Sequence, residues 1–558
     1  MQARHSFPAV ARRFQRVLGL VAGVFAAGAV QAAVPGVTGG SSAGLASFDL
    51  VAAAGNTTQP DGATIYTWGY GCNTAPAGFA PAAISGTCPV GQMQLPGPTL
   101  IVRKGDTVTV KLTNNLPAAA GNTSILFPGF KVQATGGAPG LLTQEACNGK
   151  QAAPTTQPCA GNGNTVTYTF VADTEGTHSY HSGTQGDLQV EMGLYGALIV
   201  LPSASATNIS ACGSLANQTP VYKAGYVVKG QDRGQSWLGA PSDFRLASAA
   251  YDHASTCYDR EYLFQTSEID PRIHDQARAQ ALAGASCTKR TGCMAVDTEP
   301  YHAVYFLLNG RSMPDTLDAN YAVQYPNQPY NANPHMHPGE ITLVRLIGQG
   351  RMQHPFHEHA NHVRVLARDG QMLKNANGNL SGPLLFTTTT SPGQALDVLF
   401  QYTAKNLNWD IYGHKNADAN GVATTEVCTP DANGFHSVPT DNNFFEWCGD
   451  HKKALESKPF GNVGSGGPVT LPDPNVLVNG AWYAGSPYFG PEATARAVGP
   501  TPIPPFGTIG NDPGGEAGFA FMWHSHNERE ITTNNIFPGG LMTMMLVDPW
   551  VFLIDESK

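Results

Sequence analysis

Short segments in which apolar and polar residues alternate run through much of the chain. The segment LPGPTLIVRKGDTVTVKLTNNLP (95–117) holds an alternating stretch between two turn-rich ends, and TVTYTFV (165–171) repeats the alternation. GLYGALIVLP (193–202) is instead a nearly continuous apolar run, typical of a strand buried on both faces. Because side chains of a strand alternate between its two faces, these patterns predict a first β-rich block from about residue 47 to residue 202.

A second β-rich block starts at DREYLFQTSEID (259–270) and continues through GEITLVRLIGQG (339–350) and PGQALDVLFQYT (392–403). The stretch from about 415 to 515 is rich in Gly, Pro and Asn and has little periodicity, so we interpret it as a long insertion. The last strands, in GFAFMWHSH and LMTMMLVDPW, follow it. We therefore expect an all-β chain with four parts: a signal peptide at 1–32, an N-terminal domain at 33–202, a connecting segment at 203–257, and a second domain at 258–550 that contains the insertion.

The N-terminus has the pattern of an export signal. The first 16 residues carry four arginines and no acid, an apolar run of 14 residues follows, and Val30-Gln31-Ala32 offers a small-residue cleavage site. The apolar run is short for a membrane span, so a retained anchor is the weaker alternative. We predict an exported protein, periplasmic or secreted, with no membrane span after cleavage. Without those arginines, 28 Lys and Arg face 41 Asp and Glu, and this negative charge argues against nucleic acid as a partner.

All ten cysteines lie in the exported part, and an even number in such a chain favours disulfides over metal ligation. Nearest neighbours along the chain suggest five pairs, although spacing does not prove connectivity. The pairs are Cys72–Cys88, Cys147–Cys159, Cys212–Cys257, Cys287–Cys293 and Cys428–Cys448.

Histidines gather in four short stretches: HSYH, HMH, HPFHEHANH and HSH. Imidazole suits copper, zinc, iron or nickel. Residues two apart on a strand share a face, so His357 pairs with His359, and His524 pairs with His526. A lone histidine more often sits in the core or on the surface, but two in-register pairs favour a metal site.

These motifs together resemble the multicopper oxidase family, in particular its two-domain branch. The resemblance rests on LPGPTLIVRKGDTVTVKLTNNLP, GTHSYHSGTQGDLQVEMGLYGALIV, HPFHEHANHVRVLARDG and MWHSHNERE with PGGLMTMMLV. It implies two cupredoxin-like Greek-key β-sandwich domains, copper as cofactor, and oxidation of a small-molecule substrate. It also suggests a homotrimer, because in two-domain relatives the first domain of one subunit meets the second domain of the next.

The chain departs from the family pattern at several ligand positions. Leu126, Pro128 and Gly183 stand where the resemblance expects histidines. Five of the eight expected cluster ligands remain, and these are the predicted metal ligands: His181, His357, His359, His524 and His526. Secondary candidates are His354, His178, His335 and His337.

The blue-copper site of the family is also incomplete in this sequence. Such a site needs one thiolate and two imidazoles. His354 matches one imidazole, but Ser525 stands at the thiolate position and Glu530 at the second imidazole position. Ser525 therefore marks the loss of the blue copper, and Glu530 is left as a candidate for proton transfer.

We expect a copper-dependent oxidoreductase whose substrate reaches a mononuclear or dinuclear copper site directly, through space left by the missing histidines. Two alternatives stay open: a copper-sequestering protein without turnover, and a metal-free scaffold that keeps the fold. Zinc or manganese instead of copper is disfavoured by the family resemblance and by copper's higher affinity for such ligands.

Overall fold

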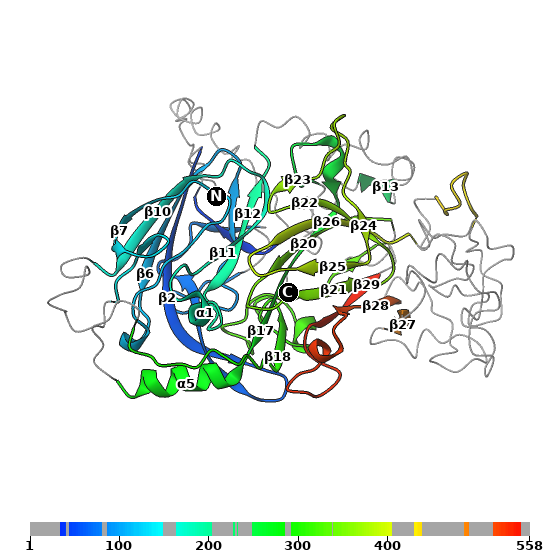
Figure 1. Cartoon of the computed structure of the whole chain (residues 1–558). Helices are drawn as coiled ribbons and strands as arrows, with labels where there is room; N and C mark the ends of the chain where they lie inside the picture. Colours follow the sequence, from blue (N-terminus) through cyan, green and yellow to red (C-terminus); the bar gives the residue numbers. More distant parts are fainter. Residues whose placement is uncertain are drawn as a thin grey trace, which may run out of the picture. The chain divides into compact units, whose positions relative to one another are not determined.

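The computed structural model describes most of the chain from residue 34 onward (Figure 1). The described ranges are 34–40, 44–80, 86–148, 163–203, 227–228, 231–232, 248–284, 292–337, 339–403, 429–437, 485–489 and 517–547. Within these ranges, no helix is long and apolar enough to cross a membrane. The predicted signal peptide, residues 1–32, lies outside them.

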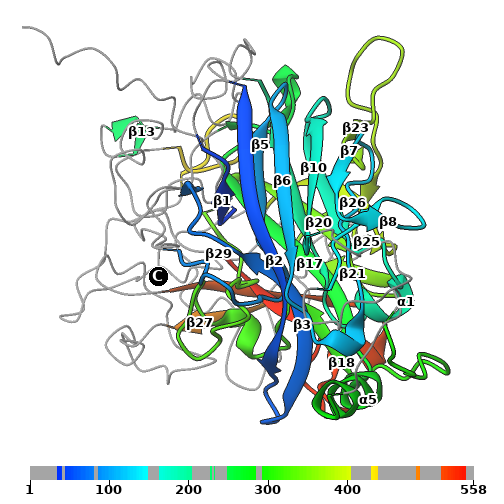
Figure 2. The ribbon, with the colours of Figure 1, turned by 90° about the vertical axis from the view of Figure 1, so that its left-hand side faces the viewer.

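The first sandwich consists of two five-stranded sheets. One sheet has the order β11 (Gly176–His181), β12 (Tyr195–Leu201), β5 (Leu100–Arg103), β1 (Gly36–Thr38) and β4 (Gly78–Ala80). The other has the order β3 (Thr64–Cys72), β2 (Leu45–Thr58), β6 (Thr107–Asn114), β10 (Thr165–Val171) and β7 (Gln133–Gly136), and Figure 2 shows β2, β6 and β10 side by side. In β6 every second residue is buried, as the alternation in the sequence predicts. Val108, Val110 and Leu112 of this strand form part of a core shared by the two sheets.

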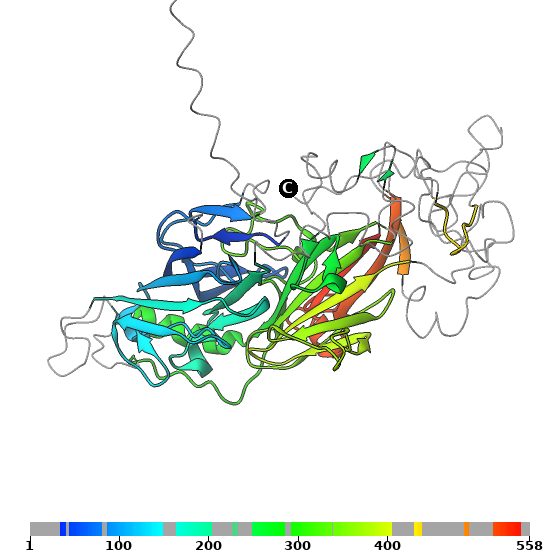
Figure 3. The same cartoon turned by 90° about the horizontal axis from the view of Figure 1, so that it is seen from above.

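The second sandwich is built from two larger sheets. One contains β18 (Tyr305–Leu308), β17 (Arg260–Ile269), β20 (Ile341–Gly348), β26 (Ala395–Gln401), β22 (Val363–Arg368), β23 (Gln371–Met372) and β24 (Leu384–Leu385). The other contains β19 (His335–Met336), β29 (Met542–Val547), β28 (Ala517–Ser525), β21 (His354–Glu358), β25 (Thr387–Thr390) and β27 (Gly485–Phe489). In Figure 3, the orange and red strands from the end of the chain lie among the green ones, so the strands after the insertion complete this sandwich.

Helices are short and few among the described residues. They are α1 (Gly186–Gln189), α5 (Pro271–Leu282) and the 3₁₀ turns η1 (Ala118–Ala120), η3 (Ala254–Thr256), η4 (Asp315–Leu317) and η5 (Glu528–Ile531). Small ladders add β8 (Ala138–Pro139), β9 (Gln144–Glu145), β13 (Val227–Val228), β14 (Gln231–Asp232), β15 (Ser248–Ala249) and β16 (Cys257–Tyr258). Helix α5 begins where Asp270 caps the amide of Arg272 and Pro271 occupies the first turn, and it packs Ile273 and Ala277 into the core of the first sandwich.

The predicted fold class is confirmed, because the described residues form two β-sandwiches with few helices. The domain boundaries drawn from the sequence stay predictions. Of the 415–515 insertion, only residues 429–437 and strand β27, which pairs with β28, are described. Met545 of β29 lies in the core of the second sandwich.

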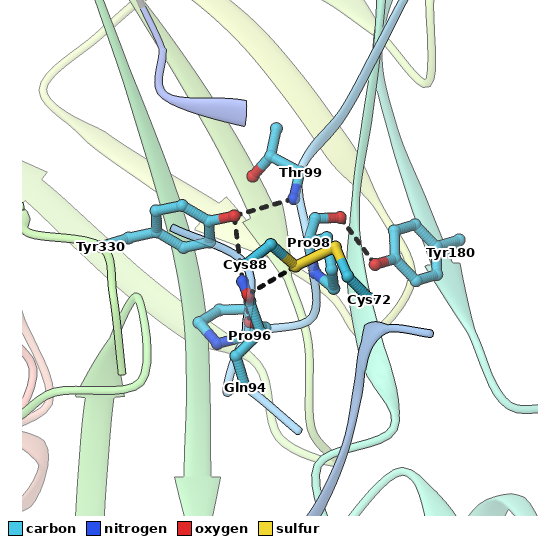
Figure 4. The surroundings of a disulfide bond; sticks show 8 residues. All are labelled: Cys72, Cys88, Gln94, Pro96, Pro98, Thr99, Tyr180 and Tyr330. Atoms are coloured by element: carbon cyan, nitrogen blue, oxygen red, sulfur yellow. Dashed lines mark hydrogen bonds between the residues drawn. A yellow bond between two sulfur atoms is a disulfide. The ribbon is translucent and has the colours of Figure 1, made fainter. Parts of the chain in front are cut away.

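The disulfide prediction is confirmed for Cys72–Cys88, which closes the loop after β3 (Figure 4). Cys147, Cys257 and Cys293 are also disulfide-bonded, while their predicted partners at 159, 212 and 287 lie outside the described residues. The predicted Cys428–Cys448 pair lies entirely outside them. Within the described residues, no cysteine is free.

Candidate metal centre

The two predicted histidine pairs lie on adjacent strands. Strand β21 pairs antiparallel with β28, and the register places His357 opposite His524 and Phe356 opposite Ser525. Because side chains of paired residues point to the same face of a sheet, the two histidine pairs share a face. On the opposite face, Phe356 and Trp523 enter the core of the second sandwich.

The four imidazole rings form one compact group. The ring of His357 lies 4.6 Å from that of His359, 5.6 Å from that of His524 and 5.0 Å from that of His526, measured between centroids. The Nε2 atoms of His359 and His524 are 3.1 Å apart. Two nitrogens bound to one metal at about 2 Å each are separated by roughly 3 Å, so this pair has the spacing of a chelating pair.

Burial keeps the imidazoles of His357, His359 and His524 neutral. Burial first, and then the neighbouring histidines, lower the pKa of His359 to about 3 and the pKa of His357 to about 4. Burial also lowers the pKa of His524. A metal binds the lone pair of a neutral imidazole, so these three rings are in the ligating form at neutral pH.

Hydrogen bonds decide which ring nitrogens carry lone pairs. His524 donates Nδ1–H to the carbonyl of Ser525 at 2.7 Å, so its Nε2 carries a lone pair. His357 Nδ1 is 2.8 Å from the Thr387 hydroxyl. His359 Nδ1 is buried and has no hydrogen-bond partner among the described residues. Within those residues, no three His, Cys, Asp or Glu side chains are arranged to hold one metal ion as they stand. The donor set, neutral imidazoles with available lone pairs, fits copper.

His181 lies apart from this group, at the end of β11 in the first sandwich. It donates Nδ1–H to the Ser182 carbonyl at 3.1 Å, and its backbone pairs with Leu126. Among the described residues, it makes no hydrogen bond or ring contact with the other four predicted ligands.

The space expected from the missing histidines is filled at Gly183. A Cβ at Gly183 would lie 2.7 Å from Cγ of Leu126, so the two replacements pack against each other. Direct substrate access through the space left by the missing histidines stays a prediction, and Leu126 fills part of that space beside Gly183. Leucine occupies the volume that a larger side chain at position 183 would need.

His354 occupies the inward face of β21 and is fully buried. Its Nδ1 lies 2.9 Å from Glu530 Oε2 and its Nε2 lies 2.8 Å from Glu268 Oε2. Burial alone would lower the pKa of His354, but hydrogen bonds to the two carboxylates and their charges raise it to about 9. A doubly protonated ring has no lone pair, so His354 is not available as a metal ligand in this arrangement.

Ser525 and Glu530 belong to the same buried group. The Ser525 hydroxyl donates to Glu530 Oε2 at 2.6 Å, and both side chains are fully buried. The three positions at which the family resemblance locates the blue copper are thus occupied by a hydrogen-bonded network. Glu530, a candidate for proton transfer, lies within this network and not on the histidine face.

His178 is buried between Phe130 of the first sandwich and the turn at Gly370 of the second. Its Nε2 bonds the Thr174 carbonyl at 3.1 Å, and its ring packs 4.6 Å from that of Phe130. These contacts account for its burial without a metal.

The remaining secondary candidates lie at β19. His335 Nε2 is 3.1 Å from the side-chain amide nitrogen of Asn333, and His337 Nδ1 is 3.0 Å from Glu340 Oε1. Strand β19 pairs with β29 and not with the strands that carry the four histidines.

Sequence reasoning overlooked Glu268 and Thr387. Glu268 lies in β17, all of whose residues are buried, so a carboxylate within the run REYLFQTSEI was a usable indication of an internal partner. The sequence around Thr387 gives no such indication, because threonines are common in strands whether or not they contact a site.

Residues 88–205 match the family model described as multicopper oxidase. An L-ascorbate oxidase of Brassica rapa subsp. pekinensis is 39% identical over 107 residues, which cover 19% of this chain and 16% of that protein. A laccase, abr2, of Aspergillus fumigatus is 36% identical over 111 residues, which cover 20% of this chain and 16% of that protein. The matches thus span about a sixth of the length of these curated relatives. The solved structure of the multicopper oxidase mgLAC aligns with 90% of this chain and 85% of its own, at 15% identity and a TM-score of 0.41.

Proposed function

We propose that the chain is a copper-dependent oxidoreductase of the multicopper oxidase family without a blue-copper site, because residues 88–205 match that family's model. Copper is the cofactor that the family implies, and when bound it supplies one-electron redox chemistry. The observation that carries the proposal is the group of four imidazoles on the shared face of β21 and β28, of which burial keeps His357, His359 and His524 neutral. They would hold a mononuclear or dinuclear site.

The side chains at the expected blue-copper position are the reason that we propose no blue copper. A blue-copper site requires a thiolate, and Ser525 offers a hydroxyl that is already bonded to Glu530. Both ring nitrogens of His354 are hydrogen-bonded to carboxylates, those of Glu530 and Glu268. Substrate would therefore deliver electrons at the histidine face itself, where His357 is half-buried and His526 is exposed.

His181 is the proposed fifth ligand, and it lies in the first sandwich without contact to the other four in this chain. A homotrimer, in which the first sandwich of one copy meets the second sandwich of the next, would bring it to the site. Light scattering on the copper-loaded protein tests this, and a stable monomer that retains its copper would contradict it.

The second candidate function is copper sequestration without turnover. The observation that favours it is the occupied blue-copper position, since relatives with that site have a dedicated place for electrons to enter. A metal-free scaffold is the third reading, and the half-exposed group of neutral imidazoles argues against it.

The deciding experiment combines elemental analysis, absorption and electron paramagnetic resonance spectra with oxygen uptake on the mature protein. We expect bound copper, no intense blue band and oxygen consumption with a small-molecule reductant. Bound copper without oxygen uptake would favour sequestration, and zinc or no metal would overturn the copper proposal. N-terminal sequencing of the exported protein tests cleavage after Ala32 in the same preparation.

A further inference from the structure

We propose that Glu530 is a positioning residue that holds the two histidine-bearing strands in register from the inward face of the sheet. Its single carboxylate joins the turn that contains His526 to His354, the first residue of β21. This inference rests on the proposed metal site and adds the groups that orient its ligands. We call Ser525, Glu530, His354 and Glu268 the carboxylate clamp.

On one side, the clamp closes the turn at residues 525–530, which contains His526. Glu530 Oε2 accepts from the Ser525 hydroxyl at 2.6 Å, and Glu530 Oε1 accepts from the Asn527 side-chain amide at 2.9 Å. The Ser525 hydroxyl in turn accepts from the Asn527 backbone amide at 3.1 Å. His526 lies inside this turn, and among the described residues its ring makes no hydrogen bond. The position of His526 therefore depends on the backbone that Glu530 holds.

On the other side, the clamp fixes the start of β21. His354 bonds Glu530 with one ring nitrogen and Glu268 with the other. Carboxylates only accept hydrogen bonds, so the ring donates both and bridges them as a cation. Glu268 belongs to β17, and its side chain accepts hydrogen bonds from the backbone amides of Arg351 and Met352, at 2.6 Å and 2.9 Å. The imidazolium thus links β17, β21 and the turn after β28.

The clamp acts on the ligands through the backbone, not by touching a metal. The His526 amide donates to the Pro355 carbonyl at 2.8 Å, so the turn and the start of β21 are also joined directly beside the clamp. Groups that orient metal-binding histidines typically change metal affinity by about 10- to 100-fold when they are removed. Glu530 is placed for such an effect on His526 and, through His354, on His357.

Two isosteric variants separate positioning from charge. Glu530→Gln and Glu268→Gln each remove one carboxylate charge from the same imidazole. Only Glu530→Gln also disturbs the turn, because its NH2 group either replaces Oε2, which accepts from Ser525 and His354, or replaces Oε1 and faces the Asn527 amide, which is also a donor. In Glu268→Gln, His354 can become neutral and still donate to Glu530, so the turn stays intact. We expect Cu(II) affinity, measured by calorimetry, to fall about 10-fold in Glu530→Gln and less than about threefold in Glu268→Gln.

Hydrogen–deuterium exchange on the metal-free proteins measures, without copper, how firmly the clamp holds the backbone of the turn. We expect peptides that cover residues 526–531 to exchange faster in Glu530→Gln than in the wild type, and Glu268→Gln to match the wild type there. If Glu530→Gln does not fold, Ser525→Ala serves instead, since it removes the acceptor of the Asn527 amide and should speed exchange at the same turn. Equal changes in the two glutamine variants, or unchanged exchange at the turn, would overturn the proposal. A wild-type protein that binds no copper would overturn the proposed function, while the exchange result would still decide the clamp.

Discussion

The two faces of strands β21 and β28 carry histidines in opposite states. On the outward face, His357 and His359 are partly exposed, and burial and their neighbours lower the pKa of each. On the inward face, His354 is fully buried between two carboxylates that raise its pKa to about 9. The same residue type, three positions apart on one strand, is thus a neutral donor of lone pairs on one face and a cationic cross-link on the other. The difference lies in what each face meets, since outward rings meet other imidazoles and the inward ring meets Glu268 and Glu530.

The comparison also explains how charge is balanced on the inward face. A cation bound there would neutralise nearby carboxylates, and the imidazolium of His354 does this with a proton. Glu358, on the same inward face, has a pKa raised to about 8 by burial and accepts from the Thr388 hydroxyl at 2.7 Å. The inward ionisable groups are thus enclosed by the core of the sandwich, while the outward groups are available for ligands.

The largest expected effect tests the inward face. His354→Ala leaves Glu268 and Glu530 buried without their cation, and breaking such a buried pair typically costs about 3–5 kcal/mol in the free energy of unfolding. The matched outward change, His357→Ala, should cost less than about 1 kcal/mol in the metal-free protein, because the side chain is half-exposed. Urea unfolding of the metal-free variants measures both. Similar costs on the two faces would contradict the assignment.

The charge of His354 predicts alkaline instability. Its pKa is raised in the folded protein from the ordinary 6.5 to about 9, so its stabilising contribution is complete below pH 6.5 and is lost as the pH rises through about 9. The loss amounts to roughly 3 kcal/mol at most, at 1.36 kcal/mol for each pKa unit. Urea unfolding of the metal-free protein between pH 6 and pH 9.5 measures it. Glu268→Gln removes one of the two carboxylates and should flatten the dependence, and an equally steep dependence in that variant would refute the explanation.

The next effect tests the outward face. Removing one pair, in His524→Ala with His526→Ala, deletes two of the four imidazoles, and we expect copper affinity to fall by about 100-fold or more. His178→Ala is the control, because that ring packs on Phe130 in the first sandwich and should leave copper content unchanged. Elemental analysis after dialysis measures both. Unchanged copper in the double variant would remove the basis of the proposed site.

The smallest expected effect compares two neighbouring threonines of β25. Thr387 contacts His357 Nδ1 at 2.8 Å on the outward face, whereas Thr388 donates to Glu358 on the inward face. Thr387→Val should weaken copper binding about 10-fold and leave stability nearly unchanged. Thr388→Val should instead lower stability by about 1 kcal/mol and spare copper binding. Calorimetry and urea unfolding on both variants give the test, and reversed effects would exchange the roles of the two faces.

The histidine group was predictable from the sequence because it depends on local geometry. Two residues with one between them share a face of any strand, so His357 with His359 and His524 with His526 follow from spacing alone. The clamp was not predictable in this way, since Glu268 lies 86 residues before His354 along the chain. Only the parallel pairing of β17 with β20 and the packing of the two sheets bring them together.

The sequence by itself determined the all-β class and the spacing of the two histidine pairs, and it suggested the Cys72–Cys88 disulfide. Each of these follows from residue identity or from short spacing, which the backbone converts directly into geometry. The tertiary structure alone decided that the pairs face each other at His357 and His524, that Leu126 fills the volume beside Gly183, and that His354 is a buried cation. These outcomes depend on strand register and on which distant groups share a dehydrated interior. In such an interior the partners of an ionisable group, rather than its own chemistry, set its charge.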